Sequence, residues 1–71
     1  MTIARIRENI SDKKGDTVKV IYNGSRNRKE EYVGVISEVY SYIFIVKLDE
    51  TRVKSFCYSD VLTRVINLYF I

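Results

Sequence analysis

Isoleucines with helical spacing mark the beginning of the chain. In the segment from Thr2 to Lys14 they fall three and four residues apart, on one face of a helix: Ile3, Ile6 and Ile10. Thr2 offers a side-chain oxygen suited to the N-cap, and Gly15 is the residue type that commonly follows a helix end. A helix of this length is marginal alone, so we expect its isoleucines to dock against the rest of the domain.

From Thr17 onward apolar and polar residues alternate instead, which is the pattern of half-buried strands. Asn23-Gly24 is a strong turn signal because both residues tolerate positive φ. We expect Ser59–Leu62 to form a single helical turn. Gly34 lies inside the longest strand segment, where it predicts a bulge or a sharp bend. The predicted strands are Thr17–Tyr22, Glu30–Tyr40, Tyr42–Leu48, Arg52–Tyr58 and Thr63–Phe70.

This order predicts a mainly β fold, a five-stranded SH3-like or Sm-like barrel with a short N-terminal α-helix. A bend at Gly34 would let the second strand serve both halves of the barrel. The 71 residues are expected to form one domain, with the helix in residues 1–14 and the barrel in residues 16–71. A domain of this size has no room for a deep cleft that holds both a cofactor and a substrate.

The composition argues against catalysis. The chain has no histidine, so the commonest general base is missing, and no Ser–His or Cys–His pair exists. A zinc site would need several Cys or His ligands, and Cys57 is the only residue of either type. It falls in an alternating strand, where we expect a small packed residue rather than a reactive thiol. The three glycines are too scattered for a phosphate-binding loop. We therefore predict no enzyme, no catalytic residue, no metal and no cofactor.

The lone cysteine also fits a reducing cytoplasm, because secreted domains this small usually carry paired cysteines. The N-terminus lacks the continuous apolar stretch of a signal peptide. The longest apolar-rich segment, Tyr42–Leu48, is too short to span a bilayer. We expect a cytoplasmic protein without membrane contact.

Positive charge is concentrated in the first part of the chain. Residues 1–29 carry eight basic groups against three acidic ones, a net charge of +5, whereas residues 30–71 carry four against six, a net charge of −2. A binding partner could recognise this asymmetry. The densest cations, Arg26, Arg28 and Lys29, follow the Asn23-Gly24 turn.

Three interpretations of this basic segment stay open: a solvated hairpin tip, a contact for a protein, and a contact for nucleic acid. The helix could extend the basic patch through Arg5 and Arg7 if it packs nearby. Lys19, on the polar side of the first strand, could then link the two groups. The candidate partner-binding or nucleic-acid-binding residues are therefore Arg5, Arg7, Lys19, Arg26, Arg28 and Lys29.

Aromatic and apolar residues supply further candidates. Four tyrosines could offer stacking platforms for bases, although half-buried strand packing explains them as well: Tyr32, Tyr40, Tyr42 and Tyr58. The apolar segment Leu68–Ile71 fits either barrel closure or an interface between copies of the chain.

Several blocks of the chain are distinctive in combination. They are the N-terminal helix ending at Gly15, Asn23-Gly24 followed by Arg26, Gly34–Tyr40, Ile43–Val46 and Ser55–Thr63. Together they resemble the Veg family, small bacterial proteins associated with stimulation of biofilm formation. The resemblance covers nearly the whole chain, and Gly34–Tyr40 and Ser55–Thr63 are its more specific parts. Ser41 is a departure, because proline is expected there, and it relaxes the turn between the second and third predicted strands.

The Veg resemblance implies a compact SH3-like barrel with a regulatory, non-enzymatic role, acting by relief of a repressor of extracellular-matrix genes. It brings no catalytic residues to carry over. A weaker resemblance is to Sm-like RNA-binding proteins such as Hfq. Tyr58-Ser59-Asp60 stands here in place of their tyrosine-lysine-histidine segment, so the lysine and histidine that would hold RNA are missing.

Two functions follow as hypotheses. In the first, the chain binds a cytosolic protein, a transcription repressor, through the basic segment and nearby tyrosines. In the second, the same cations bind DNA or RNA directly. The net charge of +3 is low for a dedicated nucleic-acid-binding protein, which places the second hypothesis behind the first.

Overall fold

The computed structural model describes residues 2–24 and 28–71, which begin with the helix α1 (Ile3–Ser11). The Thr2 hydroxyl accepts a hydrogen bond from the backbone N–H of Arg5 at 3.2 Å, so the predicted N-cap is confirmed. Ile6 and Ile10 are buried in the core as expected, whereas Ile3 is 37% exposed, so its predicted docking is wrong. The helix ends earlier than predicted, because the chain turns after Asp12. Gly15, at φ +92, then donates its N–H to the Ile36 carbonyl at 2.8 Å.

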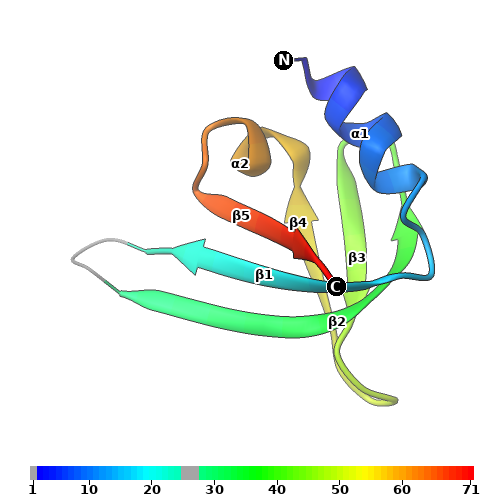
Figure 1. Ribbon diagram of the computed structural model, residues 1–71, viewed down its shortest axis with the longest axis vertical. Helices are drawn as coiled ribbons and strands as arrows, with labels where there is room; N and C mark the ends of the chain where they lie inside the picture. Colours follow the sequence, from blue (N-terminus) through cyan, green and yellow to red (C-terminus); the bar gives the residue numbers. More distant parts are fainter. Residues whose placement is uncertain (1, 25–27) are drawn as a thin grey trace.

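Five antiparallel strands follow, joined in the order β4-β3-β2-β1-β5 (Figure 1). Their bounds lie close to the predicted ones except at the start of the last strand. There Thr63 caps the short helix α2 (Tyr58–Leu62) and Arg64 takes a left-handed conformation, so the predicted strand start at Thr63 is wrong. The strands are β1 (Thr17–Asn23), β2 (Lys29–Val39), β3 (Ile43–Lys47), β4 (Val53–Cys57) and β5 (Ile66–Phe70).

The sheet is coiled but open, so the predicted closed barrel is not confirmed. Among the described residues β4 pairs only with β3 and β5 only with β1, which leaves these two strands as the edges of the sheet. Both helices lie on the same side of the coiled sheet, and α2 connects its two edge strands (Figure 1). The hydrophobic core therefore closes through helices rather than through a pairing of β4 with β5.

The core lies between the inner face of the sheet and the two helices. Tyr58 and Phe44 are fully buried at its centre, where their rings stack with centroids 5.6 Å apart. The remaining core residues come from α1 and all five strands: Ile6, Ile10, Val18, Val20, Ile36, Val46, Phe56 and Ile66. Alternation along β4 turns Phe56 inward and Cys57 outward. Cys57 is exposed, so the expectation that it is packed is wrong.

Gly34 has a different role from the predicted bend. The register shift in β2 falls between Ile36 and Glu38, whereas Gly34 stays in regular pairing with Val18. A Cβ atom at position 34 would stand 2.5 Å from the Lys47 carbonyl oxygen and 2.8 Å from a methyl group of Val46. Glycine is therefore required because the neighbouring strand β3 comes too close to position 34 for a side chain.

Neither of the helices in the described part of the chain has the length and apolar character needed to cross a membrane.

Candidate binding surfaces

The predicted basic residues divide between the two ends of β2. Arg28 and Lys29 lie at its start, whereas Arg5 and Arg7 lie on α1, beyond its far end (Figure 1). Arg26 lies outside the described residues. Most of the length of β1 and β2 lies between the two groups, so they do not form one patch along these strands. Their use as one binding site stays a prediction.

The hairpin tip is the first of the two surfaces, and we define it as Arg28, Lys29 and Arg64 around Asn23. The Gly24 N–H donates to the Arg28 carbonyl at 2.7 Å, and Asn23 pairs with Lys29 across the hairpin. Arg28 and Lys29 are exposed, and among the described residues no ion pair involves either of them.

Arg64 belongs to the hairpin tip although the sequence places it far away. Asn23 donates its backbone N–H to the Val65 carbonyl at 2.8 Å and its side-chain amide to the Arg64 carbonyl at 3.3 Å. One asparagine thus joins the loop before β5 to the end of β1. The predicted helical turn before Arg64 was the signal that could have placed this residue, because the chain returns from the turn to the sheet beside β1.

Lys19 does not link the two groups. Its Nζ lies 3.2 Å from a carboxylate oxygen of Glu31, on the outer face of the sheet midway along β1. Its cross-strand neighbours are Val33 and Tyr69. The charge of Lys19 is therefore balanced within the sheet.

The helix–turn surface is the second candidate, and it consists of Arg7, Tyr40, Ser41 and Tyr42. The Arg7 Nη1 donates to the Ser41 carbonyl at 3.2 Å, which attaches α1 to the turn between β2 and β3. Tyr40 is 53% exposed and Tyr42 is 82% exposed. A shallow groove runs between α1 and this turn, lined by Ala4, Arg7, Glu8, Ser11, Asp12, Val39, Tyr40 and Ser41.

Tyr58 fixes this turn from inside the core. Its hydroxyl donates to the Tyr40 carbonyl at 2.5 Å, and its backbone N–H donates to the Tyr42 carbonyl at 3.2 Å. Burial raises the pKa of the Tyr58 phenol, against smaller opposing effects of the Arg7 charge and of the hydrogen bond to Tyr40. The hydroxyl therefore stays protonated at neutral pH and remains a donor to the turn.

The family model described as biofilm formation stimulator VEG matches residues 1–69. The chain belongs to the Veg family. No curated protein matches it. The match runs from α1 into β5 and so includes both surfaces, and it confirms the family assignment made from the sequence blocks.

Ser41, the departure from the Veg pattern, leaves its turn closed. The Tyr40 N–H donates to the Ile43 carbonyl at 2.9 Å, and Arg7 binds the Ser41 carbonyl. The expected relaxation relative to a proline-containing turn stays a prediction. The segment Tyr58-Ser59-Asp60, compared above with the Sm-like proteins, opens α2 and carries the buried Tyr58.

The four tyrosines suggested as stacking platforms in this Veg-family chain differ in how far their rings are exposed to solvent. Tyr58 is buried. Tyr32 donates its hydroxyl to Glu30 at 2.8 Å and lies under the ammonium of Lys54, 4.8 Å from the ring centroid. Only Tyr40 and Tyr42 present open ring surface, and both belong to the helix–turn surface.

The C-terminal apolar residues do not close a barrel. Tyr69 and Ile71 are exposed, and the Lys13 ammonium lies 5.7 Å from the centre of the partly exposed Phe70 ring. An interface between copies of the chain stays a prediction.

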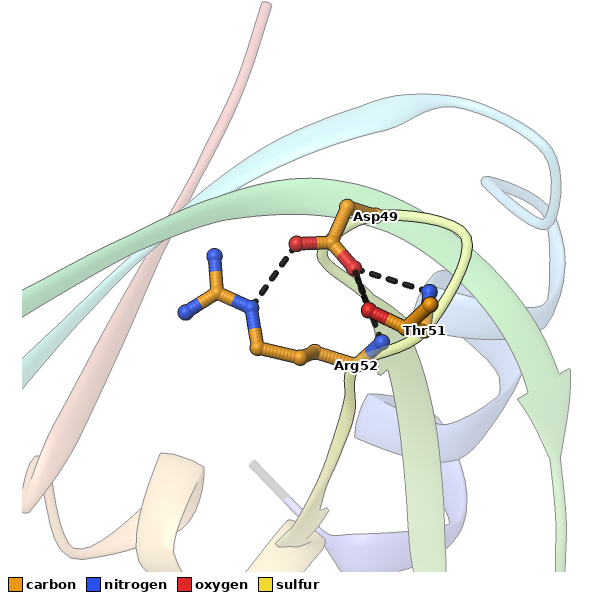
Figure 2. Close-up of polar contacts among 3 residues, drawn as sticks. All are labelled: Asp49, Thr51 and Arg52. Atoms are coloured by element: carbon orange, nitrogen blue, oxygen red, sulfur yellow. Dashed lines mark hydrogen bonds and ion pairs between the residues drawn. The ribbon is translucent and has the colours of Figure 1, made fainter.

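Asp49 has the most perturbed acidity, but the cause is a turn rather than a reactive site. Its Oδ1 accepts the N–H of Thr51 at 2.9 Å, the hydroxyl of Thr51 at 3.0 Å and the N–H of Arg52 at 2.8 Å (Figure 2). Its Oδ2 accepts the Arg52 Nε at 2.8 Å. These bonds, that from the Arg52 side chain most of all, hold the pKa of Asp49 well below its usual range. The carboxylate thus closes the hairpin between β3 and β4.

Metal or cofactor binding gains no support from the described part of the chain, where no group of three His, Cys, Asp or Glu side chains gathers. The prediction that the chain is not an enzyme remains a prediction. What the described residues offer is surface chemistry, namely cations and exposed aromatic rings.

Proposed function

We propose that this Veg-family chain acts in biofilm formation as a non-catalytic interaction protein that binds a cytosolic protein, a transcription repressor, through the helix–turn surface. The observation that carries the proposal is the placement of an anchored arginine, Arg7, beside two exposed tyrosines on a turn fixed to the core.

Residue type and rigidity both favour a protein partner. Tyrosine and arginine are enriched among the residues that dominate protein–protein binding energies. Ordering a long side chain on binding costs free energy, and the bond from Arg7 to Ser41 meets part of that cost beforehand. The two hydrogen bonds from Tyr58 do the same for the backbone of the turn.

The charges around the groove also favour a protein partner. Arg7 lines the groove together with the carboxylates of Glu8 and Asp12. A surface of mixed sign suits a protein with complementary charges, whereas closely spaced phosphates would be repelled by the two carboxylates.

Capture from bacterial lysate tests the proposal, with Tyr42→Ala and Tyr40→Ala as test variants. Tyr69→Ala is the matched control, because Tyr69 is 54% exposed but lies on β5, away from the turn. The proposal predicts that wild type and Tyr69→Ala retain a transcription regulator that both test variants lose. Equal recovery by all four proteins would count against the helix–turn surface.

Direct binding of nucleic acid is the second candidate function, and the hairpin tip favours it. Arg28 and Lys29 stand exposed there, and Asn23 brings Arg64 to the same place. Anisotropy of labelled duplex DNA and single-stranded RNA over a salt series tests it. Each phosphate neutralised adds about 0.9 to the log–log slope for duplex DNA. A lack of binding even at low salt would eliminate this candidate.

A further inference from the structure

Arg64 has an unusual backbone for an arginine. Its φ of 64° is the one positive value found at a non-glycine position within residues 2–24 and 28–71. It follows Thr63, the C-cap of α2, and donates its N–H to the Val61 carbonyl at 3.2 Å. Glycine, and less often asparagine, is usual at such a left-handed helix end, because other side chains are strained there. The helix end explains the conformation but does not explain the choice of arginine.

The position of Arg64 connects groups that otherwise lie apart. On one side its carbonyl binds the Asn23 amide, beside Lys29. On the other side Arg64 lines a groove between α1 and the free edge of β5, together with Asn9 and Asn67. Asn9 also borders the next shallow depression, which Arg5 lines. The same groove is also lined by apolar residues, namely Ile6, Ile10, Val61, Ile66, Leu68 and Phe70. The polar and basic residues that lead from the hairpin tip to α1 therefore lie among apolar side chains.

We propose that Arg64 is the central cation of a nucleic-acid-binding track that runs from Arg28 and Lys29 past Asn67 and Asn9 to Arg5. The inference rests on the second proposed function and adds to it a residue and a path. The link that was expected from Lys19 is supplied by Arg64, whose charge is not paired within the described residues.

The chemistry of the track suits a phosphate backbone. Arginine and lysine neutralise phosphates, and asparagine amides donate hydrogen bonds to phosphate oxygens. Glu8, at the Arg5 end, is the one acidic residue that lines the two depressions in the described chain. Strained backbone is retained in proteins where the strained residue does something that a relaxed one could not. Arg64 is exposed at this position, and its backbone carbonyl binds Asn23, the cross-strand partner of Lys29.

The test variant is Arg64→Asn, which removes the charge and suits the left-handed conformation better. Its melting temperature should equal or exceed that of the wild type by up to about 5 °C. Its affinity for a short labelled DNA duplex should nevertheless fall by about threefold to tenfold at low salt, with a salt slope smaller by about one. A stability gain paired with a binding loss separates a binding role from a merely structural one.

Lys47→Gln is the matched control. It removes the same charge from an exposed position on β3, away from the track, and should leave the salt slope unchanged. If Arg64→Asn behaves like Lys47→Gln while Lys29→Ala still weakens binding, the assignment of Arg64 is overturned and the second function stands. If the wild type binds no nucleic acid, both are overturned. Displacement of DNA by poly-glutamate at equal charge concentration would also overturn the inference, because the site would then select carboxylates as readily as phosphates.

Discussion

The hairpin tip and the helix–turn surface lie at opposite ends of β2, and the protein holds them in different ways. At the helix–turn surface, Tyr58 reaches from the core to bind both sides of the turn, and Arg7 binds its backbone from α1. At the hairpin tip, the contacts are those of Asn23 with the loop before β5 and the bond between Gly24 and Arg28. One surface is fixed to the core and the other is attached at the periphery.

Because of this difference, binding at the two ends should depend on different physical interactions. Short-range contacts of aromatic rings and of an anchored arginine depend on fixed geometry. Attraction between exposed cations and a polyanion depends on net charge and ionic strength, and tolerates a less ordered surface. Changes in the core near Tyr58 should therefore affect the helix–turn surface first, and salt should affect the hairpin tip first.

The largest effect is expected from Tyr58→Ala, which removes the anchor and a fully buried aromatic ring together. Truncation of a buried aromatic residue costs about 3–5 kcal/mol, a large share of the stability of so small a domain. Urea unfolding monitored by circular dichroism measures the loss. A variant with wild-type stability would show that the stack of Tyr58 on Phe44 does not hold the core.

Gly34→Ala should come next, with a loss of about 1–3 kcal/mol, because the added methyl group would collide with the backbone of β3. Gly34 lies between the two surfaces, so both binding activities should decline together as the folded fraction falls. Thermal unfolding checks the stability. An unchanged melting temperature would mean that β3 can move away from β2 at no cost.

Tyr58→Phe should separate the two ends most clearly. It keeps the ring but removes the hydrogen bond to the Tyr40 carbonyl, at a cost of about 1–2 kcal/mol. Partner capture by the helix–turn surface should weaken, while binding of DNA at low salt should stay at the wild-type level in the folded protein. Equal loss of both activities would contradict the separation of the two surfaces.

The smallest effect is expected at the β3–β4 turn, which belongs to neither surface. Asp49 has a pKa below its usual range, so its contribution to stability is present above about pH 4 and is lost as pH falls through the folded-state pKa. Asp49→Asn should lower the melting temperature at pH 7, and the difference from wild type should shrink in acid. Glu50→Gln, in the same turn, is the control. A difference that persists unchanged in strong acid would exclude the ionised carboxylate as its source.

Local patterns predicted most of the secondary structure, because spacing and turn residues act over a few positions. The N-cap at Thr2, the docking of Ile6 and Ile10, and the helical turn after Cys57 are confirmed. The open edges were not predictable in this way, since alternation in a strand does not reveal whether it has one neighbour or two.

The candidate sites depend on contacts between distant parts of the chain, and here the sequence was less informative. Arg28 and Lys29 were chosen as part of a dense basic segment, and Arg5 and Arg7 as its extension if the helix packs nearby. The length of β2 separates the two pairs. Arg64 was missed because its neighbour at the hairpin tip, Asn23, lies 41 positions away. Charge density along a chain therefore identifies candidates but cannot group them.

Amide hydrogen exchange on the captured complex tests the central claim most directly. The claim is that the protein partner covers the helix–turn surface, so the account predicts new protection in α1 and at Tyr40, Ser41 and Tyr42, with little change at Arg28 and Lys29. Protection confined to the hairpin tip, with α1 and the turn exchanging as in the free protein, would contradict it.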